Sequence, residues 1–163
     1  MKEPKLNFSI VLVAPEIPGN TGSIGRTCLA LNIPLILIHP LGFDLDEKAV
    51  RRAGLDYWKD VTLEEFENWQ SFMDKHQPAP EQLCLFTSHA TRPFFDISMS
   101  SKQPEDHRYL VFGGETAGLP PEIRESFPDS LYTLPMYSDK VRSLNLSNVV
   151  TAVAYEGVRQ NLD

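Results

Sequence analysis

Short apolar runs recur along the chain and alternate with segments of helical periodicity. The runs cover residues 8–14, 35–38, 82–87, 108–113 and 130–135, and each is bounded by glycine, proline or polar residues. Continuous apolar runs of this length are typical of strands that are buried on both faces of a parallel sheet. Their alternation with helices predicts an α/β fold, in which one parallel sheet lies between two helical layers (α/β/α).

Four helices are predicted between these strands. Residues 23–31 follow a turn at 19–22, where an Asn or a Thr is available as the N-cap. Residues 44–52 are acidic at the start and basic at the end, which suits the dipole of a short helix. A capping box opens a predicted helix over 62–73, and a pair of prolines opens a short one over 120–127.

The last fifth of the chain, residues 140–156, joins a polar loop to a closing helix. Ser143, Asn145 and Ser147 each offer a side-chain oxygen to the amides of the first turn. An apolar stripe recurs at helical spacing and consists of Leu146, Val149, Val150, Val153, Ala154 and Val158. The pattern fits a capped core helix, and it fits equally a helix that begins beside a ligand site.

Composition indicates one globular domain over residues 1–163, with a core of ordinary size. The net charge of −7 argues against DNA binding and against non-specific RNA binding, but not against a local basic patch. Cys28 and Cys84 lie in apolar runs, as buried thiols do in a reducing compartment. No signal segment or transmembrane run is visible, so we expect a cytoplasmic protein without a membrane partner.

Three polar or glycine-rich loops follow predicted strands, at 19–26, 113–118 and 136–145. Ligands of open parallel sheets bind at the carboxyl ends of the strands, so these loops predict a pocket. The glycines of 113–118 would let a ligand contact backbone groups directly, which suits an adenine or a ribose. The motifs of dinucleotide-binding, P-loop, thiol-redox and zinc proteins are absent, so neither an oxidoreductase nor a metal site is predicted.

Arg26 is the most informative cation of the chain. It stands near the start of a predicted helix, where a positive charge does not help the helix dipole. It is either a solvated surface residue or a guanidinium aimed at a phosphate or at a reacting oxygen. Arg51, Arg52, Lys140 and Arg142 are further candidates for a local cationic patch.

Taken together, the three loops resemble the motifs of the SPOUT superfamily of RNA methyltransferases. The matching segments are Pro18–Arg26, Leu110–Pro120, Leu134–Met136 and Ser143–Asn148. With Arg51–Tyr57, their order is most similar to the branch that methylates the 2′-hydroxyl of the tRNA wobble nucleotide. This chain departs from the family pattern at Gly19 and Gly114, which replace prolines, and at Ala117, which replaces a common basic residue.

The resemblance implies a trefoil knot at the C-terminal end and a homodimer through the first and last helices. The small residues Ala152, Ala154 and Gly157 of the last helix agree with the close approach of a partner. The family binds S-adenosyl-L-methionine within the knot, which implies that the cofactor contacts Phe86, Gly113, Leu134, Met136 and Ser143 here.

The implied reaction is methyl transfer to the ribose 2′-hydroxyl of the tRNA wobble nucleotide, either a cytidine or a modified uridine. A sulfonium methyl is a strong electrophile, so the enzyme has to align the hydroxyl and help remove its proton. Arg26 matches the family arginine proposed to activate this hydroxyl. Because a guanidinium keeps its proton, we expect Arg26 to clamp a phosphate and orient the hydroxyl instead.

The resemblance also assigns the remaining site residues. The other implied catalytic-site residues are Asn20, Ser143, Asn145 and Tyr155, the last of which is either a catalytic-site or an interface residue. Glu115 joins Asn20 in fixing loop geometry. The implied RNA contacts are Arg51, Arg52, Lys140 and Arg142. Two other functions stay open: a non-catalytic RNA-binding or assembly protein with the knotted fold, and a 2′-O-methyltransferase of ribosomal RNA.

Overall fold

The computed structural model describes residues 2–45, 56–100 and 102–162, and it contains a six-stranded sheet in the order β3-β2-β1-β5-β4-β6. Every pair of neighbouring strands is parallel. The strands are β1 (Phe8–Val13), β2 (Leu35–Ile38), β3 (Leu63–Phe66), β4 (Leu83–Phe86), β5 (Arg108–Phe112) and β6 (Leu131–Tyr132). All five predicted strands are therefore present, although the one predicted over 130–135 is reduced to the two residues of β6, and β3 is an additional strand.

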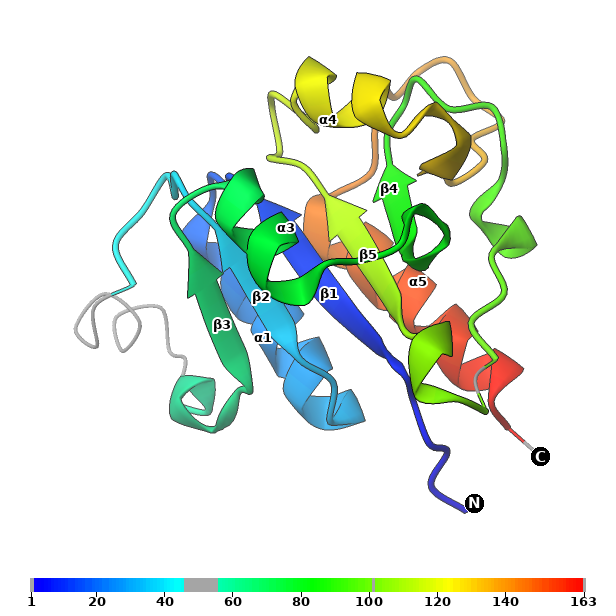
Figure 1. The fold of residues 1–163 in the computed structure, drawn as a ribbon. Helices are drawn as coiled ribbons and strands as arrows, with labels where there is room; N and C mark the ends of the chain where they lie inside the picture. Colours follow the sequence, from blue (N-terminus) through cyan, green and yellow to red (C-terminus); the bar gives the residue numbers. More distant parts are fainter. Residues whose placement is uncertain (1, 46–55, 101, 163) are drawn as a thin grey trace.

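Helices cover both faces of this sheet. Helices α1 (Pro18–Leu31) and α5 (Leu146–Gln160) lie behind it, and α3 (Trp69–His76) lies in front (Figure 1). The short helix α4 (Pro121–Ser126) lies beyond the arrowheads of β4 and β5 (Figure 1). Single 3₁₀ turns cover Trp58–Asp60, Pro80–Gln82, Phe94–Asp96, Pro104–Asp106 and Pro128–Ser130. The α/β fold with a parallel sheet between helical layers is confirmed.

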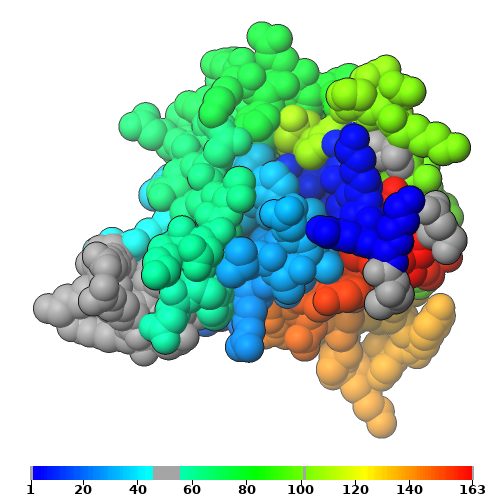
Figure 2. Space-filling model, turned by 90° about the horizontal axis from the view of Figure 1, so that it is seen from below, coloured from blue at the N-terminus to red at the C-terminus, as the bar shows by residue number. Residues whose placement is uncertain are grey.

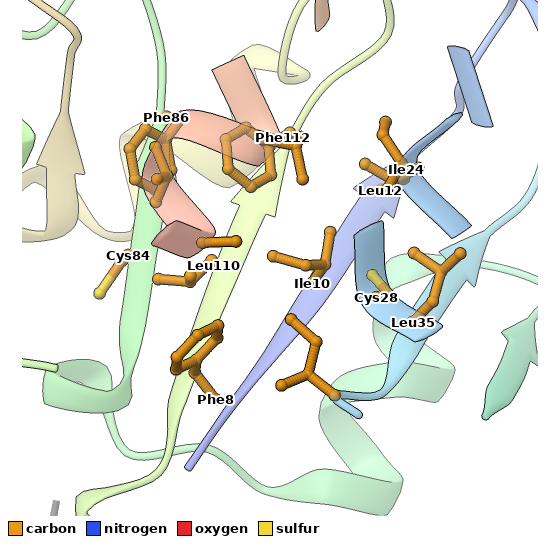
Figure 3. Close-up of a cluster of buried hydrophobic side chains, with 14 of the residues drawn as sticks. Phe8, Ile10, Leu12, Ile24, Cys28, Leu35, Cys84, Phe86, Leu110 and Phe112 are labelled. Atoms are coloured by element: carbon orange, nitrogen blue, oxygen red, sulfur yellow. The ribbon is translucent and has the colours of Figure 1, made fainter. Parts of the chain in front are cut away.

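The side chains of the sheet divide between two cores, because successive residues of a strand point to opposite faces. In β1, Ile10 and Leu12 join the core that also contains Ile24 and Cys28 of α1 (Figure 3). Val11, the residue between them, belongs to the other core together with Phe72 of α3. The central strands are buried on both faces, which is why they form continuous apolar runs in the sequence.

Cys28 and Cys84 are both buried, as the sequence predicts. Burial raises the pKa of each thiol to about 12, so neither is a thiolate at neutral pH. Within the described ranges, no helix is long and apolar enough to cross a membrane.

The predicted helix over 62–73 is wrong in its first half. Residues Leu63–Phe66 form the edge strand β3, which is registered against Leu35–Ile38 of β2. The helix begins only at Trp69, and its N-cap is Asn68, whose side chain accepts a hydrogen bond from the Ser71 amide. Pairing with β2 satisfies the backbone of this segment and outweighs the local capping pattern.

The first helix also begins earlier than predicted. Helix α1 includes residues 19–22, which the sequence suggests as a turn, and its N-cap Ile17 makes no side-chain capping bond. Pro18 occupies the first helical turn, where its fixed φ suits the helix and its missing N–H is no loss. Asn20 is therefore not a cap and is available for other contacts. The predicted helix over 44–52 falls mostly outside the described residues.

Two of the small residues that the sequence suggests for a partner surface are used inside the chain instead. Ala154 is fully buried, and Gly157 is buried against the edge of the Phe8 ring. A Cβ atom at Gly157 would lie 2.6 Å from Cε1 of Phe8. Only Ala152 of the three is exposed. Small side chains on α5 therefore serve the packing of the helix on β1.

We expect Gly157→Ala to lower the free energy of unfolding by about 1–2 kcal/mol, because the added methyl overpacks the Phe8 contact. The matched control is Gly19→Ala, where an added Cβ meets nothing within 4 Å. In that helical position the substitution should raise stability by roughly 0.5–1 kcal/mol. Urea unfolding of both variants measures the effect, and equal shifts of the same sign would contradict the packing argument.

Candidate active site

A cavity of about 640 Å³ opens at the carboxyl edge of the sheet, within the usual size range of small-molecule sites. Its walls come from four loops and three helices. They include Ile17 and Asn20 at the start of α1, residues 86–89, residues 112–119, Arg124 of α4, and parts of the segment 133–149. The three segments predicted as loops, 19–26, 113–118 and 136–145, therefore all contribute to one cavity, the first of them through Asn20 of helix α1.

The second loop, residues 113–118, folds back tightly on the end of β5. The Gly118 amide donates a hydrogen bond of 2.9 Å to the Gly114 carbonyl, and Gly118 has the left-handed φ of 68°. A Cβ atom at Gly113 would overlap the backbone of Gly118, so only glycine permits this approach. The loop consequently lines the cavity largely with backbone polar groups, as a site for an adenine or a ribose requires.

Two glutamates tie the loop that follows β1 to the second loop. The carboxylate of Glu115 accepts hydrogen bonds from the amides of Glu16 (2.7 Å) and Ile17 (3.1 Å). In return, Oε1 of Glu16 accepts from the amides of Thr116 and Ala117, each at 3.2 Å. We call this pair of contacts the reciprocal carboxylate contact. It fixes the two loops against each other across the ends of β1 and β5.

The reciprocal carboxylate contact depends on charge and on space. Hydrogen bonds from Ala117 and Thr116 hold the pKa of Glu16 below its ordinary value. Their stabilising effect is therefore complete above the ordinary pKa and is lost as the pH falls through the lowered one. A Cβ atom at Gly114 would lie 2.7 Å from Oε1 of Glu16, so the glycine at this position leaves room for the carboxylate.

Asn20 extends this network to the third loop. Its Nδ2 donates to Oε1 of Glu115 (3.3 Å), and its Oδ1 accepts from Nδ2 of Asn145 (3.1 Å). Asn145 is the N-cap of α5, since its Oδ1 accepts from the amides of Ser147 and Asn148. One chain of hydrogen bonds thus joins all three loops to the start of the last helix.

The deep wall of the cavity is apolar. The rings of Phe86 and Phe112 stack with their centroids 4.5 Å apart and an angle of 14° between their planes (Figure 3). They stand at the ends of β4 and β5, directly below the loops. All five residues expected to contact the cofactor line the cavity, namely Phe86, Gly113, Leu134, Met136 and Ser143.

The structure does not bring every expected site residue to the cavity. Asn20, Ser143, Asn145 and Arg142 line it, whereas Arg26, Tyr155 and Lys140 do not. Arg51 and Arg52 lie outside the described residues.

Arg26 and Tyr155 lie instead on the exposed surface of the helical layer. The guanidinium carbon of Arg26 is 5.7 Å from the centroid of the Tyr57 ring. The Tyr57 hydroxyl donates to the Gly22 carbonyl, which anchors that ring on α1. Tyr155 is 51% exposed on α5. Seen from below, the gold-orange third loop projects beyond α5 (Figure 2). Its residue Tyr137 is 97% exposed.

Two parts of the cavity wall were not predicted from the sequence. The loop at 87–89 follows β4, so the rule that identified the other three loops would have found it. Arg124 carries no such signal, because its place in the wall depends on how α4 packs. Among the described residues, no group of three or more His, Cys, Asp or Glu side chains could hold a metal ion.

Comparison with known proteins identifies the family. The model of the SpoU rRNA Methylase family matches residues 7–155, nearly the whole chain. The chain belongs to this family. The resemblance to RNA methyltransferases that the three loops indicate is thereby confirmed.

Several relatives of this SpoU-family chain match over almost its full length. The tRNA (cytidine(34)-2′-O)-methyltransferase of Burkholderia cenocepacia is 44% identical over 154 residues, which cover 94% of this chain and 95% of the relative. A solved structure that concerns 2-OH methylation of C/U34 on tRNA has 36% identity and a TM-score of 0.82, with 95% and 96% of the two chains covered.

A more distant SpoU methyltransferase contains the cofactor. AviRb of Streptomyces viridochromogenes, solved in complex with AdoMet, is 28% identical to this chain with a TM-score of 0.74. The match covers 96% of this chain and 58% of AviRb. The part of AviRb that this chain resembles is therefore one domain-sized portion of a longer protein.

We expect Glu115→Gln to loosen the site, because an amide cannot accept hydrogen bonds from both backbone amides and Asn20 as the carboxylate does. Each charged hydrogen bond contributes about 1.5–3 kcal/mol, so unfolding should require roughly 1–3 kcal/mol less free energy. Urea unfolding and titration with S-adenosyl-L-methionine measure stability and binding. The control, Glu122→Gln on the exposed surface of α4, should change neither quantity; a wild-type result for Glu115→Gln would contradict the role of the reciprocal carboxylate contact.

Proposed function

We propose that this protein transfers a methyl group from S-adenosyl-L-methionine to the ribose 2′-hydroxyl of nucleotide 34, the wobble position, of tRNA. The observation that carries the proposal is the cavity formed by the three motif loops in a chain 44% identical to a tRNA (cytidine(34)-2′-O)-methyltransferase. The acceptor nucleotide is a cytidine or a modified uridine. The family description names rRNA, so ribosomal RNA is the alternative substrate to be compared.

The residues of the cavity fit S-adenosyl-L-methionine. The tight turn at Gly113–Gly118 presents backbone donors and acceptors to an adenine and a ribose, and no Cβ atom fits at Gly113. Phe86, Leu134 and Met136 provide an apolar wall for the base. When bound, the cofactor supplies an electrophilic sulfonium methyl, so the protein needs no covalent intermediate of its own.

The chain's own residues position the acceptor. Asn20, Ser143 and Asn145 line the cavity and offer polar groups that orient the ribose. The carboxylate of Glu115 is already an acceptor for three donors, so its role is to hold the loops rather than to take the proton. The new O–C bond forms as the S–C bond breaks, and the hydroxyl proton passes to a phosphate oxygen of the RNA.

The homodimer of the proposal forms through α1 and α5. These helices share one face of the sheet and are tied together by a 3.0 Å hydrogen bond between the hydroxyls of Thr27 and Thr151. Arg26 and Tyr155 lie exposed on the same layer and outside the cavity of their own chain. The catalytic contribution proposed for both residues therefore depends on assembly, in which Arg26 clamps a phosphate and orients the hydroxyl.

The proposal includes the remaining features implied by the family. Residues 1–163 form one methyltransferase domain that is active in the cytoplasm, binds tRNA rather than DNA, and is knotted at its C-terminal end. The path of the chain supports the knot: after the edge strand β6, residues 133–145 return to the centre of the sheet, where Asn145 contacts Asn20. Lys140, Arg142, Arg51 and Arg52 supply the cations that contact RNA.

The central prediction is that the protein transfers labelled methyl from S-adenosyl-L-methionine to tRNA that lacks the modification at position 34. A tRNA with a 2′-deoxy nucleotide at 34 should accept no label, since the acceptor oxygen is missing. Ribosomal RNA fragments provide the comparison substrate. The proposal fails if the deoxy substitution leaves transfer unchanged, and binding of RNA without any transfer would indicate the non-catalytic alternative.

We expect Arg26→Ala to lower kcat by about 100-fold or more, because an aligned charged contact to the reacting nucleotide is lost. Cofactor affinity should stay within a few-fold, since Arg26 lies outside the cavity. Titration calorimetry and single-turnover transfer separate the two effects. Mixed dimers of Arg26→Ala with a cofactor-pocket variant, Gly113→Val, test whether Arg26 acts across the dimer. Recovered activity would show that Arg26 serves the partner's cavity. A loss of cofactor affinity in Arg26→Ala as large as its loss of kcat would contradict the role of Arg26.

A further inference from the structure

The cavity has few charged groups, and only some of them have hydrogen-bond or ion-pair partners within the protein. Glu115, Arg124 and Arg142 are the charged lining residues among the part of the chain that is described. The carboxylate of Glu115 is occupied by three donors of the first loop and α1. Neither arginine lies within ion-pair distance of a carboxylate in the described ranges. In a protein with a net charge of −7, this cavity is therefore lined by two guanidinium groups that have no carboxylate partner among the described residues.

Arg124 lies on an anchored helix, and its side chain makes one hydrogen bond within the protein. Its neighbour Ile123 is 5% exposed and packs in the second core together with Leu119. The Nε of Arg124 donates to the Leu119 carbonyl at 3.4 Å. This bond engages the inner edge of the guanidinium and leaves the two Nη groups without a protein partner among the described residues. The two Nη groups of a guanidinium present parallel N–H donors that match two oxygens of a phosphate.

The position of Arg124 favours an RNA phosphate over a group of the cofactor. The deep wall, with Phe86 and Phe112, is buried and apolar, whereas Arg124 is half-buried and Arg142 is exposed. A polyanion cannot enter a cavity of about 640 Å³ as a whole, so its backbone has to lie along the exposed rim. The second loop itself offers no cation there, because residues 113–118 include neither lysine nor arginine.

We propose that Arg124 binds the phosphate next to the acceptor nucleotide, and that with Arg142 it fixes the register of the RNA strand at the cavity rim. The inference rests on the proposed function for the identity of the RNA. It adds a contact from α4 that none of the sequence motifs contains. A phosphate fixed on this side holds the ribose so that the 2′-hydroxyl points into the cavity.

The test measures RNA binding and methyl transfer with an anticodon stem-loop RNA for two variants, Arg124→Ala and Arg124→Gln. The glutamine keeps a polar side chain but removes the positive charge. We expect the KM for RNA to rise roughly tenfold to a hundredfold, as for the loss of one charged hydrogen-bonded contact. The slope of log Kd against log salt concentration should fall by about 0.7–0.9, because one phosphate contact is lost. Arg124→Lys should keep the slope and recover part of the affinity.

Two controls distinguish this phosphate contact from a general effect of charge and from a contact with the cofactor. Arg108→Ala removes an equal charge at the amino end of β5, the sheet edge opposite the cavity, and should change neither KM nor salt slope. Calorimetry with S-adenosyl-L-methionine alone should give an unchanged Kd for the Arg124 variants. A weakened cofactor Kd with an unchanged RNA KM would assign Arg124 to the cofactor carboxylate and overturn the inference, as would a wild-type salt slope.

Failure of this inference differs from failure of the proposed function. If the wild-type protein transfers no methyl group to tRNA, the proposed function fails, while the salt slope of RNA binding still reports the Arg124 contact. If the wild-type protein transfers the methyl group, and if Arg124→Ala and Arg124→Gln have the same KM for RNA and the same salt dependence of binding as the wild type, only the inference about Arg124 is wrong.

Discussion

The reciprocal carboxylate contact between Glu16 and Glu115 is the constraint on which the site depends. Strands β1 and β5 are neighbours, but the loops that leave them have no sheet hydrogen bonds to keep them together. Each glutamate replaces those bonds by accepting from backbone amides of the opposite loop. A backbone amide without a hydrogen-bond acceptor is unfavourable, so these contacts stabilise both loops. They also determine which backbone groups remain available to a ligand, because the amides bound to Glu16 and Glu115 are already occupied.

Through Asn20, this contact also holds the C-terminal end of the third loop, although the loop itself is exposed. Residues 136–145 bury little apolar surface, so packing cannot fix their position. Their C-terminal end is held instead by Asn145, which binds Asn20 and caps α5. Because Asn20 is itself held by Glu115, the geometry of the last loop derives from the first two. The strand side of the cavity is therefore tied together by hydrogen bonds, whereas the third loop is exposed along its length.

The sequence predicts best those features that follow from local periodicity. The four central strands β2, β1, β5 and β4 are visible because both of their faces are apolar, whereas β3 is an edge strand with glutamates and a misleading capping pattern. The other edge strand, β6, is only two residues long and half-buried. The loops of the site are predictable from their place after strands, and so in principle is the loop at 87–89. Arg124 is not, since its approach to the cavity depends on the packing of Ile123. The sequence suggests a partner contact for Gly157 because it cannot reveal that Phe8 occupies the space beside it.

The net negative charge of the protein makes its specificity for RNA depend on where its few cations are placed. An RNA-binding protein with a net charge of −7 gains little from long-range attraction, because the mean field of its surface opposes a polyanion. Affinity then has to come from a few contacts at short range, and each must be correctly placed to contribute. The contacts that we propose for Arg124 and Arg142 would satisfy this condition only for a strand that presents its phosphates in the right register. A wrongly positioned RNA would meet the acidic surface without these contacts. The small number of cations would therefore weaken non-specific binding, and it would favour the strand geometry in which the 2′-hydroxyl reaches the methyl group.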